Sequence, residues 1–423
     1  MSVTSILVLS QVVLLGLFLL TAAAVTGRPW RISEGWWPVA AVVVALLVGA
    51  IPATTAVRGL GSSLDVLAFF AGLLLLAWTL RVTGSLTQLL DRMEQWAADD
   101  PRRMLAAVAV ATVAGTALLS NDAAALLLAP AVLDRIQRRG LALTPFVLTM
   151  AFTANAASAL LPISNPVNLL ILDRSQIALS SYLTTVTPAA VLGVLITVVG
   201  CLLVNGRGLA RGVAVDLGGP PPQSAHRPPV GWIAALTGLL VLTDVGFAVV
   251  RLPIGPPTLV AGALATLLVR SSDRPWKSQQ GIGWSILALV AGFSVLAAGL
   301  GDSSWLAAAT ERFTGSASTW MAGLSTGLVT AAISSVINNL PAALLVTSGL
   351  QAAHHLGILA LAAIVGADLG PNLAPFGSLS TILILGAVRS RGQPVPWARV
   401  WRLGLVVGPV ALVPTVVLVA LSR

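Results

Sequence analysis

The stretch Gly366-Ala-Asp-Leu-Gly-Pro-Asn-Leu-Ala-Pro-Phe-Gly-Ser-Leu-Ser-Thr381 decides the fold of this chain. It lies within an apolar run, 356–388, and contains three glycines, two prolines and one charged residue, Asp368. An unsatisfied backbone polar group in hydrocarbon costs several kcal/mol, so a helix can break inside a membrane only where protein encloses the break. The stretch therefore predicts a broken helix that lines a binding site, with Asp368 as its ionisable group.

The composition is typical of a polytopic α-helical membrane protein. Of the 423 residues, 57% are hydrophobic and 9% are charged, and the mean hydropathy is +0.93, far from soluble averages. The net charge of +9 is spread over short loops and forms no basic patch, which argues against a nucleic-acid partner. The single cysteine, Cys201, excludes a disulfide framework and a multi-thiolate metal site within one chain. No P-loop, zinc or nucleophile-elbow motif predicts an enzyme or a cofactor.

Apolar runs of about 18 or more residues predict membrane-spanning helices. They lie near 4–26, 36–54, 63–80, 183–204, 231–250, 257–270, 284–301 and 401–421. The first run has no basic residue ahead of it and is followed by Arg28 and Arg31. This charge order is the reverse of a secretory signal and predicts a retained helix.

Four further runs carry polar breaks. The runs 104–133 and 319–349 break at Ser120-Asn-Asp122 and at Asn338-Asn339. Halves of about 15 residues are too short to span, so these two runs predict re-entrant hairpins whose tips stop at mid-membrane. The runs 141–172 and 356–388 break between Asn155 and Asn168 and at the opening stretch, and they predict discontinuous spanning helices.

The chain also repeats itself. The aligned blocks are 65–80 with 285–300, 121–127 with 339–345, and 154–172 with 367–385. The last block sets polar positions against each other: Asn155 against Asp368, Asn165 against Ser378, and Asn168 against Thr381. Three blocks in the same order predict two structural repeats.

The basic residues predict the orientation. If the two runs 104–133 and 319–349 are hairpins, most of the 24 Lys and Arg residues fall on one side, which is then cytoplasmic, with the N-terminus outside. Under the same assignment the two repeats run in opposite directions. We therefore expect two halves, 1–204 and 231–423, joined by a Pro- and Gly-rich cytoplasmic linker, 205–230.

The breaks and tips supply the candidate site. Each exposes free helix-end N–H and C=O groups beside short polar side chains, which can bind a cation, a proton or a polyhydroxylated solute. The alternatives are an ordinary helix cap or a proline kink. Burial disfavours the charged form of a carboxyl group, so Asp122 and Asp368, the acids within these motifs, are the candidate proton carriers. The candidate substrate ligands are Ser120, Asn121, Asn155, Ser164, Asn165, Asn168, Asn338, Asn339, Asn372, Gly377 and Ser378.

These motifs resemble those of the arsenite/antimonite efflux permeases of the ion transporter superfamily. The similar segments are Ser120-Asn-Asp-Ala-Ala-Ala-Leu-Leu-Leu-Ala-Pro130, Ser164-Asn-Pro-Val-Asn168, Ile337-Asn-Asn-Leu-Pro341 and the opening stretch. The resemblance implies an all-α, elevator-type fold with inverted repeats, two re-entrant hairpins and two discontinuous helices. In that fold the hairpins and broken helices form a mobile transport domain, and the other helices form a scaffold.

The resemblance also implies a function, the export of trivalent arsenic or antimony from the cytoplasm across the plasma membrane, the inner membrane of a bacterium. The driving force would be proton antiport, alone or with a soluble ATPase partner. Ala123, Ala367 and Asn372 depart from the family pattern, which has Gly, Cys and Lys there. Related branches carry silicate, dicarboxylates or sodium, so a sodium/proton antiporter and a sodium-coupled anion or silicate carrier are the alternatives. A membrane anchor for a soluble partner is a third hypothesis, but an anchor needs no polar broken helices.

The residue types favour a neutral cargo. Thiolate chelation of arsenite needs two or three cysteines together, so arsenite would be held as its neutral trihydroxide by Asn, Ser, Thr and backbone groups. No Arg or Lys lies in the four motifs, which disfavours a dicarboxylate. The expected partners are the cargo, protons and the lipid bilayer, and the sequence leaves both a monomer and a homodimer open.

Overall fold

A computed structural model describes residues 3–27, 32–83, 85–209, 246, 252–268, 283–315 and 318–422, and there the chain forms helices joined by turns and loops. Six of the described helices are long and apolar enough to cross a membrane. The all-α, multi-pass architecture expected from the sequence is confirmed. Of the expected elements, the span 231–250 apart from residue 246, and the linker 205–230 apart from residues 205–209, lie outside the described residues.

The first half runs from α1 to α10. Its elements are α1 Val3–Gly27, α2 Trp36–Leu47, α3 Ala53–Gly61, α4 Leu64–Val82, α5 Ser85–Ala97, α6 Pro101–Leu119, α7 Asn121–Arg138, α8 Leu143–Ala157, η2 Pro162–Ser164, α9 Pro166–Ser175, α10 Leu179–Asn205 and η3 Gly206–Gly208. The second half comprises α12 Gly255–Leu268, α13 Ser285–Leu300, α14 Ser304–Thr314, α15 Thr319–Ile337, α16 Asn339–Ala352, α17 Ile358–Leu369, η6 Gly370–Leu373, α18 Leu379–Arg389 and α19 Trp397–Leu421.

Two expectations about helix lengths are wrong. The expected single span 36–54 is two helices, because the chain turns after α2 and Pro52, in an extended conformation, precedes α3. The second expectation is that each half of the runs 104–133 and 319–349 has about 15 residues, too few to span a membrane. The first helices of these runs, α6 and α15, have 19 residues each and could cross a membrane by length and composition. That the pairs α6–α7 and α15–α16 enter the membrane and leave it on the same side stays a prediction.

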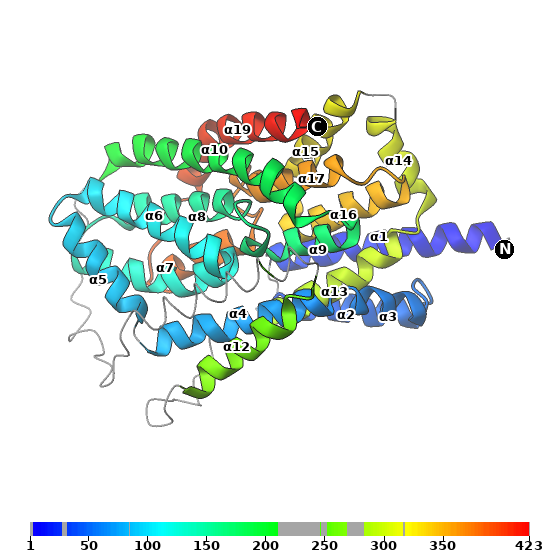
Figure 1. Cartoon of the computed structure of the whole chain (residues 1–423), viewed down its shortest axis with the longest axis horizontal. Helices are drawn as coiled ribbons and strands as arrows, with labels where there is room; N and C mark the ends of the chain where they lie inside the picture. The colour runs from blue at the N-terminus through cyan, green and yellow to red at the C-terminus, as the bar shows by residue number, and fades with distance from the viewer. Residues whose placement is uncertain are drawn as a thin grey trace.

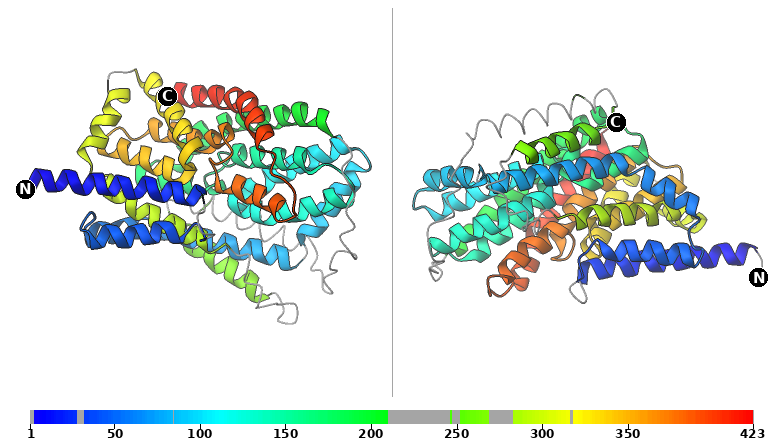
Figure 2. Two further views of the ribbon diagram at one scale, coloured as in Figure 1. Left: turned by 180° about the vertical axis from the view of Figure 1, so that it is seen from behind. Right: turned by 90° about the horizontal axis from the view of Figure 1, so that it is seen from below.

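The internal repeat is present in the backbone. Ser120, between α6 and α7, has φ 77° and ψ 157°, and the aligned Asn338, between α15 and α16, has φ 80° and ψ 152°. Asn165 and the aligned Ser378 are both extended, with φ −151° and −143°. The equivalent helices α5 and α14 lie at opposite ends of the long axis (Figures 1 and 2), as two oppositely directed repeats require.

Glycines bring selected helices into close contact. A Cβ atom at Gly72 of α4 would lie 2.3 Å from the Thr258 carbonyl oxygen of α12, and one at Gly366 of α17 would lie 2.2 Å from the Gly327 oxygen of α15. Small residues at a crossing let two membrane helices pack backbone to backbone. The chain thus holds two tightly joined pairs, α4 with α12 and α15 with α17, and the second carries the broken helix of the opening stretch.

Candidate functional site

The two broken helices meet in the middle of the molecule. In the first, α8 ends at Ala157 and the chain passes through η2 before α9; in the second, α17 ends at Leu369 and η6 precedes α18. Pro166 and Pro371 open α9 and η6, where a missing N–H costs least. Element α8 contacts both η6 and α18, and α17 contacts α9. The polar residues of the two breaks are therefore brought together.

Asp368 lies in the last turn of α17 and is fully buried. The Asn165 side-chain amide donates a hydrogen bond to its Oδ1 atom at 2.5 Å. The side chains of Ser158 and Asn168 face the same carboxyl group but complete no hydrogen bond to Oδ2, which has no partner among the described residues. One oxygen of a buried carboxyl group is thus left free to accept a proton or a ligand.

A second group of polar side chains surrounds Asn155. Its Nδ2 atom donates to Asn372 Oδ1 and to Thr381 Oγ1, both at 3.0 Å, and its Oδ1 atom accepts from the Ser380 hydroxyl at 3.1 Å. The Asn372 amide in turn donates to the Phe152 carbonyl at 3.1 Å. The expected ligands Asn155 and Asn372 therefore lie in one buried network.

Serines extend this network. The hydroxyl of Ser378 lies 2.7 Å from that of Ser380. The hydroxyl of Ser158 donates to the Asn155 carbonyl at 2.6 Å, and Ser158 also faces Asp368. Ser158 therefore lies between the network around Asn155 and the Asp368 carboxyl group.

Tyr182 is a part of the site that the sequence did not predict. Its hydroxyl donates to the Ala159 carbonyl at 2.8 Å and accepts from Asn168 Nδ2 at 3.2 Å. The same amide donates to the Ser158 carbonyl at 2.8 Å, which leaves Asn168 Oδ1 without a partner among the described residues. Tyr182 is the only tyrosine of the chain and is fully buried in α10. A buried tyrosine hydroxyl needs a hydrogen-bond partner. A lone tyrosine in an apolar run was therefore the feature of the sequence that could have indicated a role for Tyr182.

The tip between α6 and α7, Ser120-Asn-Asp122, includes polar side-chain atoms that have no hydrogen-bond partner among the described residues. Ser120 accepts a hydrogen bond from the Ala123 N–H at 3.4 Å, which is an ordinary helix cap and matches the alternative weighed for this motif. Both polar side-chain atoms of Asn121 are buried without a partner among the described residues. Asp122 is buried in the first turn of α7. Ser164 donates to the Ala117 carbonyl of α6 at 3.3 Å, so the first tip packs on the first break.

The second tip touches the opening stretch directly. The Asn339 N–H donates to the Gly377 carbonyl at 2.9 Å, and Asn338 Nδ2 is buried without a partner among the described residues. A Cβ atom on Gly377 would lie 2.5 Å from the Pro371 Cα atom, so this position accepts only glycine without a shift of the backbone. Gly377 therefore has a packing role in addition to its predicted place in the site.

The network holds one carboxyl group, and no hydrogen bond of the described residues brings a basic side chain into it. The polar groups are otherwise amides, hydroxyls and backbone carbonyls. No group of three or more His, Cys, Asp or Glu side chains that could hold a metal occurs in the described part of the chain. Such a set suits a neutral, hydroxyl-bearing solute or a single proton better than an anion.

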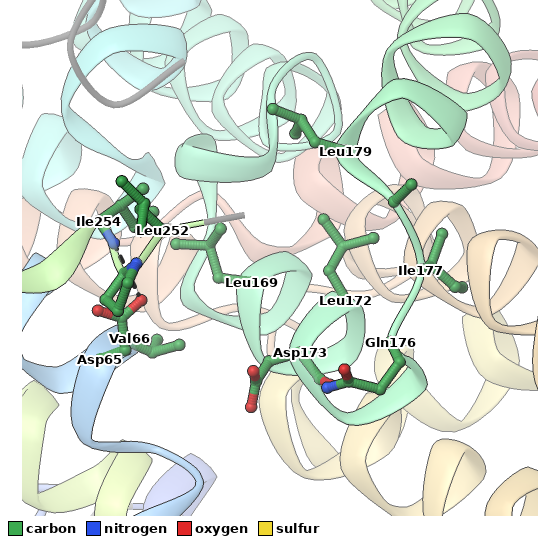
Figure 3. A pocket seen from close by; sticks show the side chains of 12 residues that line it. Asp65, Val66, Leu169, Leu172, Asp173, Gln176, Ile177, Leu179, Leu252 and Ile254 are labelled. Carbon is green, nitrogen blue, oxygen red and sulfur yellow. Dashed lines mark hydrogen bonds between the residues drawn. The ribbon is translucent and has the colours of Figure 1, made fainter. Parts of the chain in front are cut away.

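A separate cavity of about 300 Å³ lies between the start of α4, the end of α9 and the segment before α12 (Figure 3). None of the predicted site residues lines it. Its two acids are Asp65 and Asp173. The Asp65 carboxylate accepts hydrogen bonds from the N–H groups of Ile254 (3.3 Å) and Gly255 (2.8 Å) and so caps α12.

Comparison with known proteins adds the family. The profile of the citrate transporter family (CitMHS) matches residues 22–367. Two relatives named arsenical pump membrane protein, from Escherichia coli K12 and Yersinia enterocolitica, are 25% and 26% identical to this chain, and each match covers 96% of this chain and 97% of the relative. A Mycobacterium tuberculosis relative named as an uncharacterized transporter is 28% identical over 84% of this chain and 85% of its own length.

A solved structure shares the fold. The crystal structure of the YdaH transporter of Alcanivorax borkumensis aligns with a TM-score of 0.58 at 17% sequence identity, and the alignment covers 97% of each chain. At this identity the likeness concerns the arrangement of the helices alone.

Proposed function

Because this chain belongs to the citrate transporter (CitMHS) family, a family of membrane transporters, we propose that it is a secondary active transporter that exports arsenite or antimonite in exchange for protons. The observation that carries the proposal is the lone carboxyl group of Asp368, fully buried in a network of uncharged amides and hydroxyls. A proton is a ligand that such a group binds and releases.

The chemistry of the network supports the cargo. Trivalent arsenic is a neutral trihydroxide in water near neutral pH, and each hydroxyl can both donate and accept a hydrogen bond. Atoms of Asn121, Asn168 and Asn338 are buried without a partner among the described residues, and they offer the donors and acceptors that such a solute needs. The only cysteine, Cys201, is buried in α10 outside the network, so the ligands would be oxygen and nitrogen rather than sulfur. Relatives named arsenical pump membrane protein, matched over nearly the whole chain, favour the same cargo.

Asp368 is the proposed proton carrier, with Asp122 as the second. The Oδ2 atom of Asp368 is the free acceptor, and the hydrogen bond from Asn165 to Oδ1 holds the carboxyl group in place. Proton uptake removes the only negative charge in the network, so the loaded and empty states differ in charge. That difference is what couples a proton gradient to the movement of a neutral solute.

Everted membrane vesicles test the proposal. They contain the full-length chain, receive arsenite or antimonite outside, and are energised by a pH gradient, acidic inside, without ATP. We expect vesicles with the native chain to accumulate the metalloid. Vesicles with Asp368→Asn should accumulate no more than vesicles that lack the transporter. The matched control is Asp302→Asn, because Asp302 is well exposed and its 3.8 Å ion pair with Arg58 lies outside the network.

Two results would overturn this assignment. One is arsenite accumulation by Asp368→Asn equal to that of the native chain, at equal protein per vesicle. The other is no metalloid uptake, together with uptake of citrate or another carboxylate that depends on a sodium gradient. That second result would favour the sodium-coupled alternative, which the family description suggests and the absence of a basic side chain from the hydrogen-bonded network disfavours. If uptake requires added ATP and a soluble ATPase, the chain works as the membrane subunit of an ATP-driven pump rather than as a proton antiporter alone.

We further propose that the chain lies in the inner membrane of a bacterium with its basic loops in the cytoplasm and its N-terminus outside, as two oppositely directed halves, 1–204 and 231–423. The last residue of α7, Arg138, is exposed and is the decisive position. An Arg138→Cys variant should react with an impermeant maleimide in everted vesicles and not in intact cells. Cys201 is buried and should not be labelled; labelling of Arg138→Cys in intact cells contradicts the orientation.

A further inference from the structure

Helix α5 is fixed in its rotation by ion pairs with α7. Arg135 lies 2.7 Å from Asp91 and 3.7 Å from Glu94, and Arg139 lies 3.8 Å from Glu94. These contacts direct the two acids of the middle of α5 toward α7. The opposite face of α5 is therefore left for apolar side chains.

That opposite face and α6 form an apolar groove of about 390 Å³. From α5 it is lined by positions 89, 92, 93 and 96, which follow the i, i+3, i+4, i+7 spacing of one helix face. From α6 it is lined by positions 106, 107, 110, 111 and 114, of which four are alanines. The lining residues are Leu89, Arg92, Met93, Trp96, Ala106, Ala107, Val110, Ala111 and Ala114. The volume is in the range of small-molecule sites, about 300–1,000 Å³.

The groove has a cation and no acid. Arg92 is the only charged residue that lines it, and its side chain is exposed. Arg102 and Arg103 lie one helical turn before Ala106 and Ala107, so they are on the same face of α6 near one end of the groove. Trp96, 60% exposed, lies near the same end, because only residues 98–100 separate α5 from α6.

The position of α5 matches that of a membrane-surface helix. It crosses one end of the bundle steeply to α6 and α8 (Figure 1). A helix with one charged face and one face of Leu, Met and Trp lies in the membrane interface with its apolar side toward the acyl chains. A tryptophan and several arginines at that depth sit where lipid headgroups are.

We propose that the groove between α5 and α6 binds one phospholipid with an anionic headgroup, such as phosphatidylglycerol. The acyl chain lies along the alanine-lined wall of α6, and the phosphate contacts Arg92, with Arg102 and the Arg103–Asp100 ion pair at the rim. The charge of the groove favours an anionic headgroup: Asp91 and Glu94 are paired with α7 and Asp100 is paired with Arg103, so Arg92 is the charged side chain that lines the groove.

Native mass spectrometry of the purified full chain tests this, with dioleoyl phosphatidylglycerol and dioleoyl phosphatidylcholine as the two probes. We expect tighter binding of phosphatidylglycerol to the native chain. Arg92→Gln should bind it about fivefold more weakly, the effect of one basic residue near a membrane surface. Arg399→Gln is the control, because Arg399 is likewise exposed but lies on α19. Equal affinity for the two lipids, or equal affinity of the two variants, overturns the proposal.

A second variant tests the groove itself. Ala106→Phe fills it, whereas Ala23→Phe adds the same ring at an exposed site on α1. We expect loss of the bound phosphatidylglycerol only in the first. If Ala106→Phe does not fold, the Arg92→Gln comparison still decides. Efficient disulfide cross-linking of a Trp96→Cys variant into a dimer, without lipid, would assign the groove to a second copy of the chain and overturn the lipid site.

Discussion

At the scale of single residues, the site is nearly symmetric in backbone and asymmetric in charge. Asn155 and Asp368 occupy aligned positions near the ends of α8 and α17, and both are buried. Asn155 satisfies its amide with Asn372, Thr381 and Ser380, whereas Asp368 keeps one oxygen free. The symmetry supplies two similar clusters of polar side chains, and only the cluster that contains Asp368 can change its charge by binding a proton.

The hydroxyl of Tyr182 is predicted to hold the Asn168 amide in its orientation beside Asp368. Tyr182→Phe removes the donor to the Ala159 carbonyl and an acceptor of Asn168, so we expect a loss of about 1–3 kcal/mol of stability, the cost of a buried unsatisfied polar group. A lower apparent Tm in detergent and slower metalloid uptake in vesicles would be the measured changes.

The control for this variant is Thr184→Val. Thr184 lies on the same helix, is exposed, and bonds only to the carbonyls of Ser180 and Ser181 in its own helix. It should change neither the Tm nor the transport rate noticeably. A Tyr182→Phe variant indistinguishable from Thr184→Val would remove Tyr182 from the site.

At the scale of helices, the contact between α15 and α17 depends on the absence of side chains. Gly366→Ala places a Cβ atom 2.2 Å from the Gly327 oxygen, so one helix must move. Overpacking of this kind costs about 1–3 kcal/mol. Gly386→Ala in α18 is the matched control, because nothing lies within 4 Å of its Cβ atom and alanine is the better helix former. Equal thermal stability of the two variants would contradict the packing.

The breaks between helices could be predicted because their chemistry is local. Proline and asparagine in Ser164-Asn-Pro-Val-Asn168, and two prolines in the opening stretch, interrupt a helix wherever they occur. The turn between α2 and α3 was missed because the residues before Pro52 are apolar and read as one span. Ser158 and Tyr182 were missed because their role arises from contacts between distant segments, which no spacing within the chain encodes.

At the scale of the whole molecule, a partly buried ion pair joins the two halves, in addition to the exposed pair of Arg58 with Asp302. Arg391, just after α18, pairs with Asp134 of α7 and also donates to the Pro130 carbonyl at 2.9 Å. The Arg391 side chain is only 16% exposed, so Arg391→Gln should cost about 1 kcal/mol, the upper end for an ion pair with an exposed partner.

Thermal unfolding in detergent measures this effect. Arg389→Gln is the control, since Arg389 lies two residues earlier and is exposed. The exchange of both charges, Asp134→Arg with Arg391→Asp, should recover part of the lost stability. No recovery, with a loss in the single variant, would mean that the backbone contact of Arg391 matters and the ion pair does not.

The lone carboxyl group has an electrical consequence. A cycle in which Asp368 carries one proton inward while a neutral solute leaves moves one net charge across the membrane. Such a cycle produces a current, and the membrane voltage drives it even when the pH is equal on both sides. A potential of 100 mV is worth about 2.3 kcal/mol per charge, which can hold a gradient of about fiftyfold in the exported solute. Under the proposed antiport with Asp368 as the proton carrier, the membrane voltage is therefore a second driving force for export.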